Sequence, residues 1–411
     1  MRILIYGINF APELTGIGKY TGEMAAFLAA RGHEVRMITA PPYYPQWRIQ
    51  KGYSGAAYRK ERWQGLEVYR CPLWVPAGPD ASGRISGLQR ILHLGSFALS
   101  SFPVALGQLG WSPERVVVLA PSLFNAPLAG LVAKLCGGKS WLHIQDFELD
   151  AARRLRILPG LGLVFRLALK AESSLYRSFG AVSTISRRML ELLKEKGSPP
   201  ERSILFPNWV DPEQIYPLPG YNVLGNELGI PPGCAVVLYA GSMGQKQGVD
   251  VLVEAARLLG AEPNILFLLC GEGPARAQLE QLASGLANVR FLPLQPPERL
   301  NELLNLAAVH VLPQVAGAAD LVMPSKLGGM LASGKAVIVM ANPGTELADV
   351  IEPLGRVVPP QEPAILAEAI RGLADQPALR AELGRRGRVY VEETWAKDLV
   401  LEKFMLTLQT L

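Results

Sequence analysis

The chain alternates short apolar runs with longer segments in which apolar residues recur every three or four positions. In the first half, apolar runs predict buried strands at 2–6, 33–39, 116–119, 140–145 and 181–185. Residues 20–30 have helical spacing and end at Arg31-Gly32, a pair typical of a helix terminus. The order strand, glycine-containing loop, helix, strand predicts a βαβ unit and therefore a parallel sheet.

The second half repeats this alternation. It predicts strands at 235–239, 265–270, 289–291, 309–312 and 336–340, and helices at 249–259, 275–283, 327–332, 364–374 and 378–391. The Pro- and Gly-rich stretch 212–220 between the halves is typical of an interdomain linker. We therefore expect an α/β protein with two doubly wound parallel sheets, in domains 1–210 and 221–394, followed by a C-terminal segment 395–411.

Residues 40–87 interrupt the rhythm, because they are rich in Pro, Arg and aromatic residues. We expect an irregular insertion or lid here. Its aromatic side chains could stack on sugars, lie on lipid or form a packed flap; they are Tyr43, Tyr44, Trp47, Tyr53 and Trp63.

Composition narrows the class of protein. Of the 411 residues, 49% are hydrophobic and 19% charged, with a formal net charge of +5, so the chain is neither disordered nor built like a nucleic-acid-binding protein. The four cysteines and four histidines lack metal-binding spacing, and we expect no metal and no other cofactor. The N-terminus passes from a short strand into a glycine, and no apolar run is long enough to span a bilayer. These features predict a cytoplasmic protein.

Three glycine-rich loops are candidates for binding an anion, at 12–19, 241–248 and 271–274. Loops at the carboxyl ends of parallel strands present backbone N–H groups, and the helix dipole that follows favours phosphate. The segment AGAADLVMPSKLGGMLA, 316–332, adds Ser325 and Lys326 at a predicted helix start. A hydroxyl and a lysine there suit a phosphate, although Ser325 could instead be a plain N-cap beside a solvated lysine.

An ordered series of motifs resembles a known family over nearly the whole chain. ILIYGINFAPELTGIGKY resembles the N-terminal glycine loop of the family 4 (group 1) retaining glycosyltransferases of the GT-B fold. YAGSMGQKQGVDVLVEA, LCGEGPARAQLE and PSKLGGMLASGKAVI resemble three motifs of their C-terminal half, and the likeness continues to about Trp395. Within that family the chain looks most like bacterial enzymes of colanic acid and related exopolysaccharide synthesis, including a fucosyltransferase. The resemblance implies two facing Rossmann-like domains with an interdomain cleft, the first for the acceptor and the second for the nucleotide-sugar donor. It also implies that residues 395–411 form a C-terminal helix that crosses back to the first domain.

The resemblance also implies a set of site residues. Donor-binding residues would be Gly16, Gly18, Gly241, Ser242, Lys246, Glu272, Gly273, Ser325 and Lys326. Of these, Gly16 and Gly18 would lie beside the diphosphate and sugar, and Glu272 and Gly273 near the nucleotide base. Asp146, with His143 as second choice, follows an apolar strand where the family carries an acid or histidine that contacts the donor sugar. Alternatively, one of the two is a buried, hydrogen-bonded residue at the strand end.

The chain departs from the family pattern at three places. Ser242 replaces the arginine of the phosphate loop, and Lys246 lies one position before the expected lysine, where Gln247 stands. The glutamate that binds ribose aligns with Gly329. The first glutamate of the pair falls beside Asp320, which could replace it.

We therefore expect a hexosyltransferase that takes a GDP- or UDP-sugar and a glycan or polyprenyl-diphosphate-linked acceptor. An epimerase or hydrolase on the same fold, or a nonenzymatic partner in polysaccharide assembly, remains an alternative. Residues 153–176 alternate basic and apolar side chains, a pattern that fits either a core helix or peripheral contact with the inner membrane.

Overall fold

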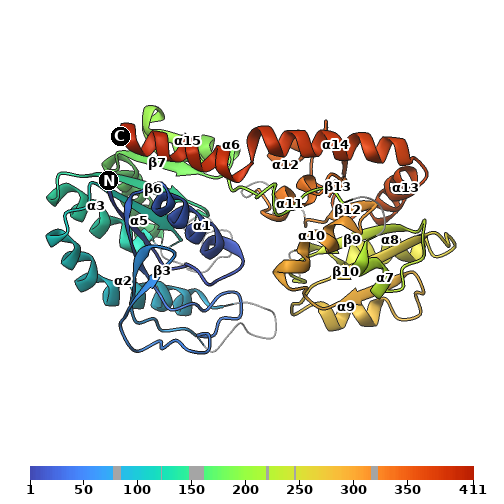
Figure 1. The fold of residues 1–411 in the computed structure, drawn as a ribbon, viewed down its shortest axis with the longest axis horizontal. Helices are drawn as coiled ribbons and strands as arrows, with labels where there is room; N and C mark the ends of the chain where they lie inside the picture. Colours follow the sequence, from blue (N-terminus) through green and yellow to red (C-terminus); the bar gives the residue numbers. More distant parts are fainter. Residues whose placement is uncertain (77–84, 122, 148–161, 219–221, 245–246, 316–322) are drawn as a thin grey trace. The chain divides into compact units, whose positions relative to one another are not determined.

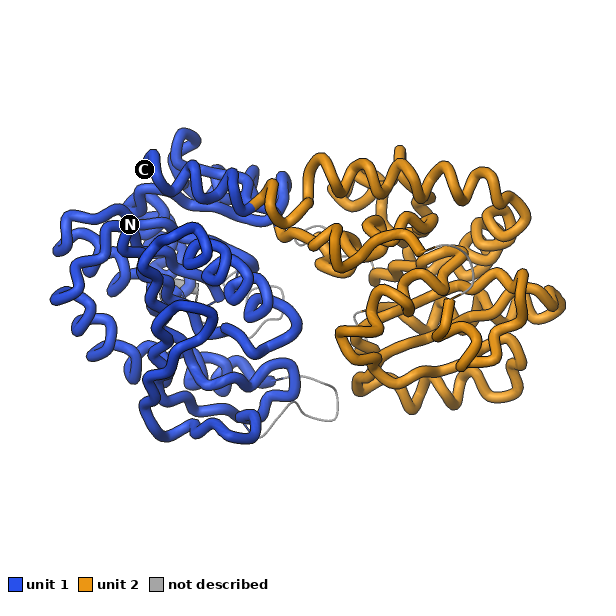
Figure 2. The backbone as a smooth tube through the Cα atoms, viewed as in Figure 1, with its two compact units in different colours: residues 1–207, 401–411 blue, residues 208–400 orange. Residues whose placement is uncertain are grey.

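The computed structural model describes residues 1–76, 85–121, 123–147, 162–218, 222–244, 247–315 and 323–411. They form two compact units, one of Met1–Pro207 with Leu401–Leu411 and the other of Asn208–Val400 (Figure 2). The chain thus enters the second unit between Pro207 and Asn208, and the stretch 212–220 predicted as a linker begins inside that unit.

The first unit contains an eight-stranded sheet in the order β3-β4-β2-β1-β5-β6-β7-β8 (Figure 1). Its strands are β1 (Arg2–Gly7), β2 (Glu34–Thr39), β3 (Arg59–Trp63), β4 (Leu66–Arg70), β5 (Arg115–Ala120), β6 (Lys139–Ile144), β7 (Ala181–Thr184) and β8 (Ser203–Leu205). All neighbours are parallel except the antiparallel pair β3 and β4. The strands predicted from the apolar runs of this half are confirmed.

Helices cover both faces of this sheet. They are α1 (Gly16–Ala30), α2 (Gly87–Gly107), α3 (Ala126–Leu135), α5 (Gly162–Ser178), α6 (Arg187–Glu195) and α15 (Lys397–Thr410). Leu4 and Val118 pack in one core cluster with Phe97 of α2 and Ala129 of α3. Trp141, from β6, packs edge-on against Phe404 of α15 with the ring centroids 4.8 Å apart. Since neighbouring side chains of a strand point to opposite faces, this arrangement explains why these strands are apolar throughout.

The expectation of an irregular insertion at 40–87 was wrong for its central part. Residues 59–70 form the β3–β4 hairpin, and β4 pairs in parallel with β2 to extend the sheet. Tyr43 is 4% exposed and contacts the rings of Trp47 and His93, at 5.5 and 4.8 Å. Trp63 packs against Phe10 at 5.0 Å. Tyr43, Trp47 and Trp63 are therefore packed, as in the flap alternative, whereas Tyr44 is 37% exposed. The high polar content of the hairpin concealed its strands.

The second unit has a six-stranded parallel sheet in the order β11-β10-β9-β12-β13-β14. Its strands are β9 (Ala235–Ala240), β10 (Ile265–Cys270), β11 (Val289–Leu292), β12 (Val309–Leu312), β13 (Ala336–Met340) and β14 (Arg356–Val358). Its helices are α7 (Val223–Glu227), α8 (Asp250–Leu258), α9 (Arg276–Leu282), α10 (Leu300–Asn305), α11 (Lys326–Ala332), α12 (Glu346–Ile351), α13 (Pro363–Ala374) and α14 (Pro377–Thr394).

The alternation of side chains divides the core of this unit into two layers. Val237 and Phe267 pack with α8 and α13, whereas Leu238 and Leu268 pack with α11 and α12 on the other face. Helices on both faces of an open parallel sheet define the doubly wound fold. Both units therefore have the predicted α/β architecture.

Candidate functional site

The loops that follow β9 and β10 lie against each other at the carboxyl edge of the second unit's sheet. The Gly241 N–H donates to Cys270 O at 2.8 Å, the Met243 N–H to Glu272 O at 2.9 Å, and the Ala275 N–H to Met243 O at 3.0 Å. A Cβ atom at Gly271 would overlap the carbonyl oxygen of Gly241. Glycine is required there because the two main chains approach too closely for any side chain.

Lys326, at the start of α11, lies against the first of these loops. Its ammonium donates to the hydroxyl of Tyr239 at 3.0 Å and lies 4.6 Å from the centroid of that ring. The Tyr239 hydroxyl in turn donates to Ser242 O at 2.5 Å. A Cβ atom at Gly241 would overlap the Lys326 ammonium, so the absence of a side chain at Gly241 makes room for the cation. The structure thus brings together Gly241, Ser242 and Lys326, three of the residues that the sequence predicts to bind the donor.

The surroundings of Lys326 favour an incoming anion. Burial lowers the pKa of the Lys326 ammonium from 10.5 to about 8, because desolvation disfavours the charged form. Among the residues that the structure describes, no carboxylate forms an ion pair with Lys326. A phosphate placed beside the ammonium would replace the missing solvation and restore its ordinary basicity.

Other predicted donor residues of this unit occupy less buried positions. The Ser325 hydroxyl is exposed and caps no backbone N–H of α11, so the plain N-cap alternative is not what the structure shows. The Glu272 carboxylate is 53% exposed and pairs with Arg276 at 2.8 Å. Gly273 packs against Met243, whose carbonyl oxygen a Cβ atom there would overlap. Lys246 and Asp320 lie outside the described residues.

In the first unit, the loop after β1 is organised by a buried carboxylate that sequence reasoning missed. Glu13 is 3% exposed, and its Oε1 accepts the N–H groups of Tyr43 and Tyr44, both at 3.0 Å. Its Oε2 accepts from Asn9 Nδ2 at 2.9 Å. Burial raises the pKa of Glu13, and the three donors and Arg70 oppose that effect. The sequence signal was an acidic residue set between a proline and two glycines in an otherwise apolar loop.

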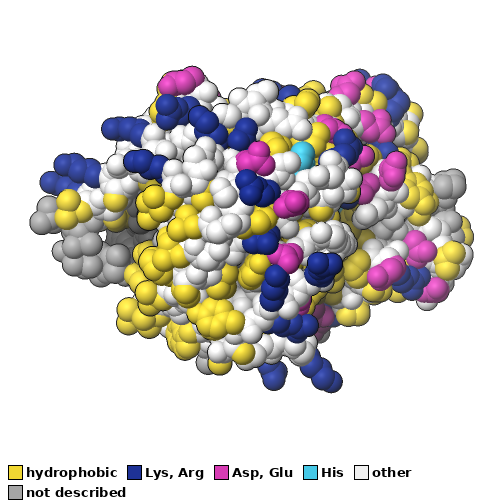
Figure 3. Space-filling model, turned by 60° about the vertical axis from the view of Figure 1, so that its left-hand side comes forward, with side chains coloured by type: hydrophobic (Ala, Val, Ile, Leu, Met, Phe, Trp, Pro, Cys, Tyr) yellow, Lys and Arg dark blue, Asp and Glu magenta, His cyan; other side chains and the backbone are white. Residues whose placement is uncertain are grey.

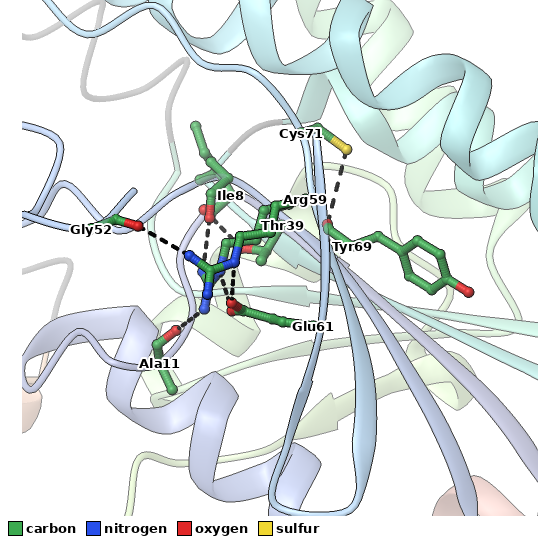
Figure 4. Close-up of polar contacts among 10 residues, drawn as sticks. Ile8, Ala11, Thr39, Gly52, Arg59, Glu61, Tyr69 and Cys71 are labelled. Carbon is green, nitrogen blue, oxygen red and sulfur yellow. Dashed lines mark hydrogen bonds and ion pairs between the residues drawn. The ribbon is translucent and has the colours of Figure 1, made fainter. Parts of the chain in front are cut away.

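Arg70 holds the same loop from the other side. Its guanidinium is buried and donates to the carbonyl oxygens of Ala11 at 2.7 Å and Ala40 at 3.0 Å. Its Nε pairs with Glu61 Oε1 at 2.6 Å, and Glu61 Oε2 accepts from Arg59 at 2.9 Å. Figure 4 shows Ala11, from the loop after β1, together with Arg59 and Glu61, both from β3, at this point. A carboxylate and a guanidinium therefore fasten the loop after β1 to the segment after β2.

The two glycines predicted at this loop have packing reasons to be glycine. Gly16 has φ +64°, and a Cβ atom there would lie 3.3 Å from the Tyr44 ring. A Cβ atom at Gly18 would lie 2.7 Å from Glu13 Cβ. Gly16 therefore lies against Tyr44, and Gly18 lies against Glu13 itself, at the carboxyl edge of β1.

His143 and Asp146 differ in their surroundings although they are three residues apart. His143 is 1% exposed, and its Nδ1 lies 2.8 Å from Ser183 Oγ while its Nε2 lies 3.0 Å from Gln145 Nε2. Burial lowers its pKa to about 3, so the ring is neutral. This matches the alternative of a buried, hydrogen-bonded residue at the strand end. Asp146 is half-buried in the loop after β6.

The carboxyl ends of β1, β5 and β6 are neighbours. Gly7 of β1 pairs with Leu119 of β5, and Ala120 of β5 with Ile144 of β6. The loop containing Glu13 and the loop containing Asp146 therefore leave the same edge of the sheet. Within the described residues, no group of three or more His, Cys, Asp or Glu side chains is placed to hold a metal ion.

Two family models match the two units. Residues 15–209 match the glycosyl transferase 4-like domain, and residues 234–376 match glycosyl transferases group 1. The chain is 42% identical over 417 aligned positions to WcaI of Escherichia coli (strain K12), which is named as a colanic acid biosynthesis glycosyl transferase. That alignment covers 98% of this chain and 99% of the relative.

Solved structures share the fold at low sequence identity. The sucrose-phosphate synthase of Thermosynechococcus elongatus superposes with a TM-score of 0.73 at 18% identity, covering 100% of this chain and 98% of the other. Anabaena HepE, solved in complex with UDP and glucose, superposes with a TM-score of 0.67 at 13% identity over the whole of both chains.

Two doubly wound units with glycine-containing loops at their carboxyl edges, together with these matches, define a glycosyltransferase of the GT-B fold. The chain belongs to the family 4, group 1 glycosyltransferases.

Proposed function

We propose that this glycosyltransferase moves a hexose from a GDP- or UDP-sugar to a glycan or polyprenyl-diphosphate-linked acceptor in exopolysaccharide synthesis, with retention at the anomeric carbon. The observation that carries the donor part is Lys326, a desolvated ammonium against the glycine loop after β9, whose described partner is one tyrosine hydroxyl. The likeness to WcaI supports the exopolysaccharide part.

Lys326 has the chemistry that departure of a nucleoside diphosphate requires. As the bond between the anomeric carbon and the diphosphate breaks, negative charge grows on the phosphate oxygens. A cation already in place and already desolvated stabilises that charge without reorganising water. Because the cation is a lysine, we propose that the leaving group is neutralised without a metal ion, with Lys246 and the loop N–H groups assisting.

In the first unit we assign Asp146, and not His143, to the donor sugar. His143 has both ring nitrogens engaged and is neutral, so it has no free function to offer a substrate. Asp146 is half-buried in the loop that leaves the same sheet edge as Gly16 and Gly18. A carboxylate there can accept hydrogen bonds from sugar hydroxyls and favour the positive charge that develops at the anomeric carbon.

The test is an incubation of the purified chain with UDP- and GDP-hexoses and a polyprenyl-diphosphate-linked sugar, with and without EDTA. We expect a new glycoside whose anomeric configuration, read by NMR, is that of the donor, formed equally in EDTA. Asp146→Asn should depress transfer strongly and leave nucleotide affinity within a few-fold. An inverted product, activity that requires added magnesium, or a fully active Asp146→Asn chain would each overturn the corresponding part of the proposal.

A further inference from the structure

The first unit carries a long helix that is apolar on its exposed side as well as on its buried side. Phe97 and Ala105 of α2 are fully buried in the core. The exposed side presents large apolar side chains in a stripe spaced at three, four and seven residues: Leu88 (68% exposed), Ile91 (41%), Leu92 (52%), Leu99 (79%) and Phe102 (49%). A surface helix ordinarily has polar side chains at these positions.

The stripe continues onto the neighbouring elements. α2 packs on α3 and on the short helix η2 (Leu123–Asn125) that precedes α3. Phe124, Leu131 and Leu135 of this pair are 53%, 47% and 61% exposed. Figure 3 shows hydrophobic side chains gathered on this side of the molecule, with basic side chains nearby. An exposed apolar surface of this kind is a mark of an interaction site.

Basic residues outnumber acidic ones in the part of the chain that forms this surface. Between positions 81 and 145 the chain has a single acidic residue, Glu114, and five basic ones: Arg84, Arg90, Arg115, Lys134 and Lys139. Glu114 lies at the amino end of β5, where its carboxylate accepts from the Arg2 N–H at 2.7 Å and its carbonyl oxygen accepts from the Lys139 N–H at 3.0 Å. A groove of about 700 Å³ beside α3 has Lys134, Lys139 and Arg202 among its lining residues and no acidic side chain.

By length and composition, Gly87–Gly110 is the one helical segment of the described residues that could cross a membrane. Its packing argues against crossing, because Phe97 is in the core and the Tyr6 hydroxyl lies 2.5 Å from Ser101 Oγ. A helix fixed along one side to a folded unit can instead lie in the plane of the bilayer interface with its other side immersed.

We propose that the exposed side of α2, with η2 and α3, is a docking surface for a bilayer rich in anionic phospholipid. The apolar stripe would enter the interface, and Lys134, Lys139 and Arg202 would contact lipid phosphates at its edge. A second copy of the chain fits this surface less well, since apposed copies would bring like charges together. This inference goes beyond the proposed transfer reaction, and its test measures binding and not turnover.

The experiment is cosedimentation of the full chain with vesicles of phosphatidylcholine alone or with about 30% phosphatidylglycerol. We expect binding to the anionic vesicles that weakens with salt. Leu92→Ser/Leu99→Ser should lower the partition coefficient at least tenfold, whereas the control Leu258→Ser/Leu294→Ser, with leucines 54% and 60% exposed in the second unit, should leave it unchanged. Lys134→Gln/Lys139→Gln should remove most of the preference for anionic lipid.

Two results would overturn the proposal. One is equal vesicle binding by the α2 variant and its control. The other is light scattering that shows a dimer for the parent chain and a monomer for Leu92→Ser/Leu99→Ser, with no vesicle binding by either. Circular dichroism of each variant checks that the fold is kept, which the exposure of all four leucines leads us to expect.

Discussion

In the first unit, the loop that follows the first strand uses its charged groups to hold itself in place. Glu13 accepts three hydrogen bonds, from Asn9, Tyr43 and Tyr44. Arg70 donates to the carbonyl oxygen of Ala11, in this loop, and to that of Ala40, in the segment after β2. In the second unit, the equivalent loop is fixed by main-chain contacts between glycines, and Lys326 binds a single neutral hydroxyl. The charged groups of the first loop are therefore engaged within the fold, whereas Lys326 has no charged partner among the described residues, as expected for the phosphate-binding lysine that we propose.

This difference predicts where substitutions affect folding and where they affect chemistry. The largest effect should come from Glu13→Ala, which leaves three buried donors without an acceptor and should lower the free energy of unfolding of the first unit by about 3–5 kcal/mol. Hydrogen exchange of the peptide containing Tyr43 and Tyr44 would show faster exchange. Glu13→Gln keeps the acceptor at Oε1 and serves as the control. Exchange in Glu13→Ala as slow as in the parent would refute the structural role.

Lys326→Ala should have the opposite character. The substitution removes a desolvated charge, so folding should be unharmed, while kcat falls by a factor that corresponds to about 2–4 kcal/mol of transition-state stabilisation. Lys335 is the matched control, because burial also lowers its pKa but it precedes β13 at the amino edge of the sheet. Steady-state kinetics of Lys326→Ala and Lys335→Ala would measure this difference, with a large fall in kcat expected for Lys326→Ala alone. A near-normal kcat for Lys326→Ala would show that the lysine does not face the leaving diphosphate.

The same contrast could be anticipated only in part from the sequence. Apolar runs located the strands because a strand buried on both faces has no polar positions. The β3–β4 hairpin escaped this reasoning, since edge strands such as Arg59–Trp63 carry charged side chains that pair with one another. Lys326 was singled out because a lysine and a hydroxyl at a predicted helix start suit a phosphate, and the structure places it against Gly241.

Glu13 was not found, because its three partners come from segments up to 31 residues away and no local pattern encodes them. His143 was placed correctly on its strand, but its role depends on Ser183, 40 residues further along. Long-range hydrogen bonds of this kind decide whether a polar side chain serves the fold or a substrate, and spacing alone does not reveal them.

A smaller effect is expected from pH. Because the pKa of Lys326 is lowered to about 8, its side chain carries a positive charge below this pH and loses that charge as the pH rises through it. Affinity for UDP or GDP should therefore fall by roughly tenfold between pH 7 and 9, because the charged fraction of Lys326 falls by about that factor over this range. Calorimetry across this range would measure the fall. Lys326→Arg, whose side chain stays charged, should bind with little pH dependence, and the same slope in both proteins would assign the titration to another group.

The smallest effect should come from Glu272→Gln, in the loop that the family resemblance places near the nucleotide base. The carboxylate is more than half exposed, and Arg276 keeps Glu280 and Gly271 O as partners when Glu272 is replaced. Exposed ion pairs contribute at most about 1 kcal/mol to the free energy of unfolding. The stability of the Glu272→Gln variant should therefore change by no more than this amount, and its nucleotide affinity by no more than a few-fold. Gly273→Ala is the contrast, because its Cβ atom would overlap Met243 O and force the two loops apart. Nucleotide titrations of both variants should show a clear loss for Gly273→Ala alone. An equal loss for Glu272→Gln would mean that this carboxylate binds the ligand itself. The loops of the second unit would then use a charged side chain as well as main-chain contacts, and the contrast with the first unit would be wrong.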